Sequence, residues 1–456
     1  MKLFRMLGLL LILAVCQTVH AQTATVNWPT TYQTIQGFGA YNGFVGTAMN
    51  SYDPLLFQTL GYSLLRSAVP LGNGTCDGSP SASCATGQDS VTDMQACVAN
   101  GCKEWLSVSN PPGEYNTSGT YNCTASAALN PSAYQPFAEY ITNYIASLNA
   151  YEGVSVYGIS AQNEPDNTDG CQMSASQFDT FISQNLGPTL ASNGQSNTTV
   201  MLPETETYGD LTSWAGTCMS DSNCSKYVGV AAFHNYGGNG AGATPPPYSV
   251  PLWETEVTSC CGVPAPIGNW SSSMSDALFW ANMVDAELSS GVSAWSYFWY
   301  VDDDTTYGTD SNSALINPAQ NPAVSTRTYA IANWAKFVRP GWVRIDATHA
   351  PVGGVTITAF KNSSTGDFVV VAVNTNNSNS SITFALSGFP GSPSSVTPWV
   401  TSSALNLAEQ SNVTVGGGSF AYALPANSVT SFVGNTTTSS TSAAPTAPTG
   451  LTAAVE

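Results

Sequence analysis

The stretch GISAQNEPD, at residues 158–166, is the most informative part of the sequence for the fold. A run of small and β-branched residues, typical of a strand, ends there at Glu164 and gives way to the turn-forming Pro165. The stretch PYSVPLWETEV, at residues 247–257, repeats the pattern and ends in Glu254 and Glu256. The ends of parallel strands gather at one mouth of a barrel, so both stretches are expected to bring a carboxylate there.

The pattern on either side of these stretches predicts an α/β fold, a (β/α)8 TIM barrel. From about residue 35, apolar strand candidates bounded by Gly alternate with longer helical patterns, as in repeated βα units. Helical spacing of apolar residues occurs at 134–148, 175–190 and 274–288. The eight strand candidates are 34–39, 62–68, 104–109, 155–162, 199–203, 228–234, 250–255 and 292–299.

After residue 339 the sequence pattern changes to short strands of alternating apolar and polar residues, separated by Gly, Asn and Ser turns. This pattern predicts an all-β sandwich side domain. The linker that follows is rich in Ser, Thr and Pro and lacks the apolar residues needed to fold. The expected segments are a signal peptide at 1–21, an N-terminal strand of the side domain at 22–33, the catalytic barrel at 34–338, the sandwich at 339–434, the linker at 435–447 and a possible start of a fibronectin type III domain at 448–456.

The charge of the chain limits its partners. The chain has ten Lys and Arg residues and 29 Asp and Glu residues, which gives a formal net charge of -19 at pH 7. Nucleic acid binding depends on clustered basic charge, so a nucleic acid partner is not expected. Anionic polysaccharides would also be repelled, and a neutral substrate is the expectation. We expect no cofactor and a monomer.

The N-terminus and the cysteines indicate a secreted protein. Basic residues, an apolar run too short to span a membrane and the small Ala21 predict a signal peptide cleaved near Ala21. Of 11 cysteines, Cys16 lies in that segment, and the other ten fit disulfides in an oxidising compartment. Cys76 with Cys84, and Cys218 with Cys224, are candidate local pairs. Zinc is not expected, because the chain has no pair of CxxC motifs and only three His.

Paired carboxylates at a barrel mouth are suited to the hydrolysis of a glycosidic bond. A retaining enzyme needs one protonated carboxyl group as the acid and one ionised carboxylate as the nucleophile, and Glu164 and Glu256 are the candidates. Glu254 is a rival to Glu256, because alternate residues of a strand point to the same side. Glu204 and Glu206, at the end of another strand, could bind either sugar hydroxyls or solvent.

The motifs resemble those of glycoside hydrolase family 30, a retaining β-glycosidase family with a (β/α)8 barrel and a β-sandwich side domain. The resemblance covers most of the chain. It rests on Thr34-Ile35-Gln36-Gly37-Phe38-Gly39-Ala40, Leu65-Arg66, Ser109-Asn110-Pro111-Pro112, residues 159–166, Phe233-His234-Asn235-Tyr236, Leu252-Trp253-Glu254-Thr255-Glu256 and Phe337-Val338-Arg339-Pro340-Gly341.

The resemblance implies separate roles for the candidate residues. Glu164 is implied to be the acid/base and Glu256 the nucleophile. Asn163 is implied to hydrogen-bond the 2-hydroxyl of the sugar. Arg66 and Tyr236 are implied to hold the nucleophile ionised and aimed.

Further residues are candidates for lining the site. His234 lies at a strand end and is either a structural imidazole or a lining residue. Trp295, Tyr297 and Trp299 alternate along the eighth strand candidate, so we expect them to share one face and to offer rings against which a sugar can stack. The alternative for each of them is a place in the barrel core.

The substrate is narrowed by a departure from the family pattern. Bacterial glucuronoxylan-specific members use an Arg after the seventh strand, but this chain has no Lys or Arg between Lys226 and Arg327. We therefore expect an enzyme similar to an endo-β-1,4-xylanase without strict dependence on glucuronate. A β-1,6-glucanase or galactanase, a glucosylceramidase-like β-glucosidase, and an inactive carbohydrate-binding protein remain open alternatives.

Overall fold

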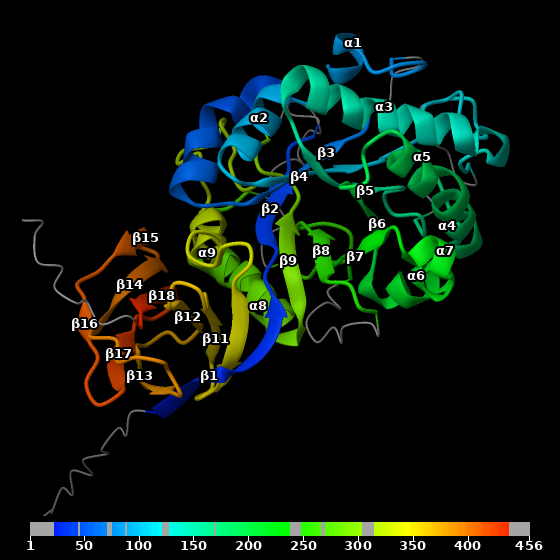
Figure 1. The fold of residues 1–456 in the computed structure, drawn as a ribbon. Coiled ribbons are helices and arrows are strands. Elements are labelled where there is room, and N and C mark those ends of the chain that lie inside the picture. Colours follow the sequence, from blue (N-terminus) through cyan, green and yellow to red (C-terminus); the bar gives the residue numbers. More distant parts are fainter. Residues whose placement is uncertain are drawn as a thin grey trace, which may run out of the picture.

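The computed structural model contains a closed eight-stranded barrel beside a β-sheet domain (Figure 1). It describes residues 22–43, 46–70, 75–86, 89–120, 127–167, 170–237, 248–265, 270–302 and 314–436. The expected signal peptide, most of the expected linker and the fibronectin-like start lie outside these residues. None of the described helices is long and apolar enough to cross a membrane.

The barrel confirms the predicted (β/α)8 fold. All neighbouring barrel strands pair in parallel, and β2 closes the ring against β9. The observed strand ends lie within a few residues of the expected ones. The barrel strands are β2 (Gly37–Tyr41), β3 (Leu64–Ala68), β4 (Lys103–Ser107), β5 (Val156–Ser160), β6 (Thr199–Thr205), β7 (Val228–His234), β8 (Leu252–Glu256) and β9 (Val292–Tyr297).

Helices pack around the barrel as the apolar spacing predicts. In α3, apolar side chains at spacings of three and four are buried, and the helix ends at Gly153 with a left-handed φ of 68°. The helices are α1 (Ala82–Ala85), α2 (Val91–Ala99), α3 (Tyr134–Glu152), α4 (Ala175–Phe181), α5 (Gly187–Ser192), α6 (Leu211–Ser220), α7 (Ser222–Ser225), α8 (Met274–Ser290) and α9 (Thr326–Ala335), with short 3-10 or π turns at Gly46–Tyr52, Pro54–Thr59, Pro131–Ala133, Ile182–Leu186 and Tyr208–Asp210.

The helical pattern at 175–190 does not form one continuous α-helix. It divides into α4, a π turn at Ile182–Leu186 and α5, which starts at Gly187. Pro188 explains the division, because proline has no N–H to donate to the preceding turn. Gly187 also lets the chain approach the ring of Tyr227, where a Cβ atom would come within 2.3 Å of the ring.

The second domain is a sheet that curls over its own apolar core. Its order is β15-β14-β18-β12-β11-β10-β1-β13-β17, and β16 pairs with β14. Phe384, Phe420 and Phe432, from three different strands, meet in this core. The strands are β1 (Gln22–Thr34), β10 (Val343–Ala347), β11 (Val355–Lys361), β12 (Asp367–Asn374), β13 (Ser380–Ser387), β14 (Ser395–Ser402), β15 (Leu405–Glu409), β16 (Val413–Thr414), β17 (Ser419–Leu424) and β18 (Ser428–Asn435).

The strand β1 precedes the barrel in sequence but lies inside the sheet of the second domain. It pairs antiparallel with β10 on one side and parallel with β13 on the other. Figure 1 shows β1, in dark blue, running from this sheet toward the barrel. The second domain is therefore built from chain on both sides of the barrel.

Disulfides join neighbouring positions in the barrel domain. Both candidate local pairs, Cys76–Cys84 and Cys218–Cys224, are present. The described residues also contain the pairs Cys97–Cys102 and Cys260–Cys261. Asp179 lies near Cys218 and Cys224, but a disulfide leaves these sulfurs no thiolate with which to bind a metal.

Candidate active site

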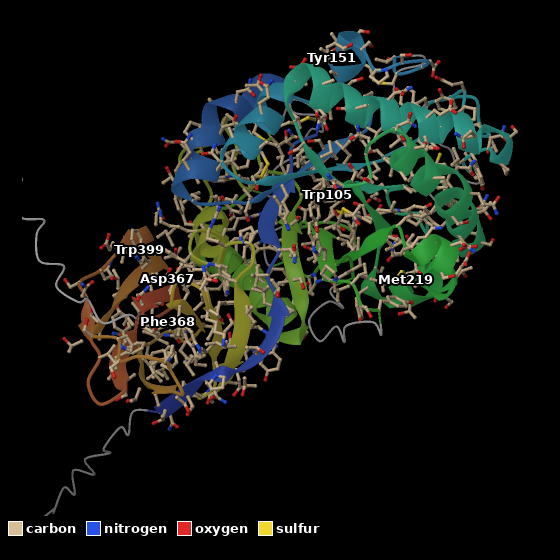
Figure 2. All side chains as sticks on the ribbon, viewed as in Figure 1. Trp105, Tyr151, Met219, Asp367, Phe368 and Trp399 are labelled. Carbon is tan, nitrogen blue, oxygen red and sulfur yellow. A yellow bond between two sulfur atoms is a disulfide. The ribbon has the colours of Figure 1, made fainter. Side chains whose placement is uncertain are left out.

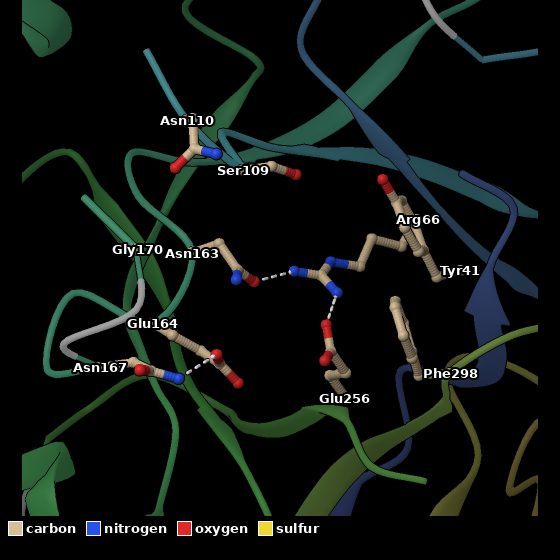
Figure 3. A pocket seen from close by; sticks show the side chains of 10 residues that line it. All are labelled: Tyr41, Arg66, Ser109, Asn110, Asn163, Glu164, Asn167, Gly170, Glu256 and Phe298. Atoms are coloured by element: carbon tan, nitrogen blue, oxygen red, sulfur yellow. Dashed lines mark hydrogen bonds and ion pairs between the residues drawn. The ribbon is translucent and has the colours of Figure 1, made fainter. Parts of the chain in front are cut away.

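A pocket of about 260 Å³ opens at the C-terminal ends of the barrel strands (Figure 3). Residues within or just beyond the C-terminal halves of β2, β3 and β8, and residues that follow β4, β5 and β9, line it, so residues distant in sequence meet there. Its lining residues are Tyr41, Arg66, Ser109, Asn110, Asn163, Glu164, Asn167, Gly170, Glu256 and Phe298.

The carboxylates of Glu164 and Glu256 meet in the pocket. Oxygens of Glu164 and Glu256 and a ring nitrogen of His234 all lie within 4.8 Å of one another. Glu256 is 7% exposed, and the side chain of Glu164 is 16% exposed. Both can therefore reach a bound molecule while most of each residue is shielded from water.

Arg66 contacts three of the polar groups in and beneath the pocket. Its guanidinium pairs with Glu256, with Glu204 at 2.7 Å, and donates to Asn163 Oδ1 at 2.5 Å. Figure 3 shows Arg66 between Asn163 and Glu256. Burial would lower the pKa of Arg66, but the charges of Glu204 and Glu256 raise it, so the residue stays cationic.

Glu256 is held from two sides. Arg66 pairs with Oε2, and the hydroxyl of Tyr236 donates to Oε1 at 2.8 Å. Burial first, and then the charge of Glu256, raise the pKa of Tyr236, so its hydroxyl keeps the proton that it donates. The carboxylate of Glu256 is thus oriented toward the pocket by one cation and one neutral donor.

Glu254 does not share the orientation of Glu256, contrary to the expectation from strand alternation. The pairing of β7 with β8 shifts register between Phe233, which pairs with Glu254, and His234, which pairs with Glu256. This irregularity re-aims the second carboxylate, as β-bulges do. Glu254 is fully buried and accepts a hydrogen bond from the backbone of Ser296 at 3.1 Å.

Glu164 is bound to an imidazole and an amide. His234 Nδ1 lies 2.7 Å from Oε1, and Asn167 donates to Oε2 at 3.1 Å. Burial alone would raise the pKa of Glu164, but the hydrogen bond and charge of His234 outweigh it and hold the pKa below its usual value. In the same way, burial would lower the pKa of His234, but Glu256, Glu164 and Glu204 raise it to about 10.

His234 lies beneath the pocket, not in its lining. The residue is fully buried, and its Nε2 lies 3.4 Å from Glu204. It therefore contacts the carboxylates and not a bound sugar. The expectation that it lines the site is replaced by a place in the network that supports Glu164.

Glu204 binds neither sugar nor solvent, the two options left open by the sequence. It is fully buried, pairs with Arg66 and accepts a hydrogen bond from Ser107 at 2.8 Å. Its backbone has a left-handed φ of 61°, and that of Glu164 has a φ of 41°. Such backbone costs about 1–3 kcal/mol per residue and is found where the surroundings fix a functional geometry.

The aromatic residues of the eighth strand were expected to stack on sugar, and the structure contradicts this for Trp295 and Tyr297. Both are fully buried, and Tyr297 packs against Trp280 of α8 and accepts from Arg327. They fill the layer between barrel and helices. Because β9 ends at Tyr297, the alternation stops there.

Two aromatic side chains that the sequence did not single out line the pocket. The rings of Tyr41 and Phe298 are stacked with centroids 5.3 Å apart and 9° between their planes. Trp299, the third aromatic expected to stack on sugar, has its ring centroid 3.8 Å from that of Phe298 and is not among the residues that line the pocket. Tyr41 could have been identified from its place just beyond the end of a predicted strand. Phe298 was missed because strand alternation singled out only residues 295, 297 and 299.

Comparisons with known proteins agree with this geometry. The chain matches the glycosyl hydrolase family 30 TIM-barrel domain at residues 101–245 and the glycosyl hydrolase family 30 beta sandwich domain at residues 341–432. The two matches together span just over half of the chain. The protein belongs to glycoside hydrolase family 30 and is an O-glycosyl hydrolase.

Individual relatives include xylan-degrading enzymes. The chain is 28% identical over 449 residues to the glucuronoxylanase XynC of Bacillus subtilis, covering 95% of this chain and 96% of that protein. The structure resembles the xylanase Xyn30A of Clostridium acetobutylicum with a TM-score of 0.78 and 25% identity, over 91% of this chain and 99% of that one. It resembles an endoxylanase of Clostridium papyrosolvens with a TM-score of 0.75 and 28% identity, over 91% and 100% of the two chains.

Proposed function

We propose that this protein is a secreted, retaining endo-β-1,4-xylanase that does not require a glucuronate branch. The observation that carries the proposed retaining mechanism is the spacing of Glu164 and Glu256, whose carboxylate oxygens lie within 4.8 Å of each other. Retaining glycosidases hold their carboxyl groups roughly 5–5.5 Å apart, whereas inverting enzymes leave about 6.5–9.5 Å for a water molecule. The short spacing favours direct attack by a carboxylate.

In the first step, Glu256 is the nucleophile. Its carboxylate oxygen forms a bond to the anomeric carbon while the bond from that carbon to the leaving oxygen breaks. Glu164 gives its proton to the leaving oxygen. Asn163, fixed by Arg66, is suited to bind the neighbouring hydroxyl of the sugar, a contact that strengthens as positive charge develops.

The proton for this step is shared by Glu164 and His234. Their pKa directions put it on His234 in the free enzyme, and the 2.7 Å hydrogen bond leads directly to Glu164. In the second step Glu164 takes a proton from water, whose oxygen attacks the anomeric carbon and releases Glu256. The imidazole thus sets how readily Glu164 gains and gives its proton.

The substrate class is supported by the xylanase relatives and by the charge of the pocket. Among the described residues that line the pocket, Arg66 is the one Lys or Arg, and Glu256 and Glu204 already pair with its guanidinium. A glucuronate branch would need a further cation, and residues 227–326 contain no Lys or Arg. A neutral xylan chain fits this pocket better than an acidic branch.

The test is product analysis on a panel of linear xylan, glucuronoxylan, β-1,6-glucan, β-1,6-galactan and glucosylceramide. We expect internal cleavage of both xylans at similar rates, with the β-anomer formed first in proton NMR spectra. An α-anomer formed first would show inversion. Cleavage of glucuronoxylan alone would contradict independence from glucuronate. Cleavage of a β-1,6-linked glycan alone would show that this glycan, and not xylan, is the substrate.

Export of the protein is supported by its disulfides, which persist in oxidising compartments. We expect the mature secreted protein to contain no free thiol among its ten cysteines. Alkylation before and after reduction, followed by mass spectrometry, measures this directly. Reactive thiols in the unreduced protein would count against the oxidised state.

A further inference from the structure

Tyr32 is an exposed aromatic residue at the junction of the two domains. It lies in β1 where this strand pairs with β10, and it is 47% exposed. Single exposed apolar residues are common and need no explanation. Tyr32 differs from such residues because its ring is fixed in place and lies between two hollows.

Side chains of β10 hold the ring. The guanidinium of Arg344 lies 3.8 Å from the ring centroid, and the Tyr32 hydroxyl donates to Asp346 at 3.0 Å. Arg344 and Asp346 are two residues apart on one strand and therefore face the same way. Arg344 in turn donates to Gln33 at 3.0 Å. The ring is preorganised, so little entropy is lost when a ligand packs on it.

Two hollows adjoin this ring and share Tyr32 and Arg344. One, of about 420 Å³, is lined by Val250, Pro251 and Leu252 and is mainly apolar. The other, of about 290 Å³, is lined by polar groups that include Asp346 and His349. We call Tyr32, Gln33, Arg344, Asp346 and His349, with these two hollows, the Tyr32 platform.

The platform has the chemistry of a sugar-binding surface. Sugars present apolar C–H faces, which pack on aromatic rings, and a rim of hydroxyls, which need donors and acceptors. The platform supplies a ring, a carboxylate, an amide and an imidazole. Asp346 is close to Arg344, and Asp285 lies 2.8 Å from His349, so the positive charges are balanced and an anionic ligand gains little.

The platform and the pocket lie at opposite ends of the barrel. Residues 250–252 and Gly291 stand at the N-terminal ends of β8 and β9, whereas Glu256 ends β8 at the other mouth. A chain segment bound at the platform is therefore not the segment being cut. Binding there would hold the enzyme on a long polymer and raise the local concentration of cleavable bonds.

We infer that the Tyr32 platform is a second glycan-binding site, which binds an uncharged stretch of the polysaccharide that the active site cuts. The inference rests on the proposed function for the identity of that polysaccharide. It assigns the platform no part in bond cleavage. Its effect is confined to polymers long or insoluble enough to offer a second segment.

The test is affinity electrophoresis in gels that contain soluble linear xylan. All proteins carry Glu256→Gln, so that the polymer is not cut during the run. Tyr32→Thr, which keeps a strand-forming residue, should weaken xylan binding about three- to tenfold, the range expected for one aromatic contact. The matched control is Tyr151→Thr, because Tyr151 is 52% exposed, lies on α3 (Figure 2) and lines neither hollow of the platform.

A second measurement separates the platform from the active site. With Glu256 intact, Tyr32→Thr should cleave a short xylo-oligosaccharide at the parent rate and insoluble xylan more slowly. Equal gel retardation of Tyr32→Thr and its parent would overturn the inference, as would an equal loss in Tyr151→Thr. If the parent cleaves no xylan, the proposed function fails instead, and the gels are repeated with the glycan that it does cleave. A thermal melt equal to that of the parent excludes unfolding as the cause of a loss.

Discussion

Glu254 and Glu256 are two residues apart in β8, but their side chains have different surroundings. Only Glu256 reaches the pocket, where Arg66 and Tyr236 hold it, while Glu254 is buried against the backbone of Ser296. The two residues are chemically identical and two positions apart. They therefore form a matched pair for mutation.

Replacing Glu256 by Ala should abolish turnover of xylan, because the bond to the anomeric carbon can no longer form. We expect a loss of at least about a thousandfold in kcat, with partial rescue by azide, which can enter the space left by the carboxylate. Glu254→Gln is the control and should keep most of the activity. Loss of turnover in Glu254→Gln with normal turnover in Glu256→Ala would exchange the two roles.

His234 should set the pH range of the enzyme through Glu164. Burial raises the pKa of Glu164 and His234 lowers it, so removing the imidazole should raise that pKa. In the parent enzyme the shared proton leaves His234, whose pKa is about 10, but without the imidazole it leaves the carboxyl group of Glu164. We therefore expect His234→Asn to move the alkaline limb of kcat/KM to lower pH and to reduce kcat about tenfold to a hundredfold. The control is Asn167→Ala, which removes only one hydrogen bond to Glu164. A limb that stays in place or moves to higher pH would contradict this coupling.

The sequence predicted Glu164 and Glu256 from the coincidence of residue type and strand end, whereas Arg66 was implied only by the family resemblance. It failed where the backbone departs from regular alternation. A register shift separates Glu254 from Glu256, and the end of β9 brings Phe298 to the pocket in place of Tyr297. Such irregularities depend on neighbouring strands and leave no local pattern in the sequence.

Among the secondary-structure elements, α8 and α9 form a buried contact with each other and with β9. Arg327 of α9 pairs with Asp276 of α8 at 2.7 Å and donates to the hydroxyl of Tyr297 at 2.5 Å. Asp276 also accepts from Trp280. One guanidinium therefore joins two helices to a barrel strand, which explains why Tyr297 faces the helices.

Arg327→Met should destabilise the protein, because Asp276 would remain buried without its cation. The expected cost is about 3–5 kcal/mol in the free energy of unfolding, measured by urea denaturation. The double variant Arg327→Met with Asp276→Asn should recover part of that stability, since it removes the unpaired charge. A single variant as stable as the parent would show that the pair contributes little.

At the scale of the whole molecule, buried acids make stability depend on pH. Burial, and then the charge of Asp53, raise the pKa of Asp93 to about 8, and burial raises the pKa of Asp53 to about 6. Burial also raises the pKa of Glu287 to about 8. In each case the folded protein holds its proton more tightly than the unfolded chain does.

The sign of the pH effect follows from these directions. A group whose pKa is raised on folding contributes stability in full below its unfolded pKa, near 4, and loses it as pH rises through the folded value. The free energy of unfolding should therefore fall between about pH 4 and 8. Asp93→Asn should flatten this decline in urea titrations at several pH values, whereas exposed Glu409→Gln should not. Stability that rises over this interval would contradict the proposed protonation.

The position of β1 fixes the order in which the two domains can be completed. The strand is made before any part of the barrel, but its partners β10 and β13 are made after all of it. During synthesis, the strands that pair with β1 in the sheet are made only after about 300 further residues. The sheet of the second domain thus needs chain from both sides of the barrel sequence, so this domain cannot be exchanged as a simple C-terminal module.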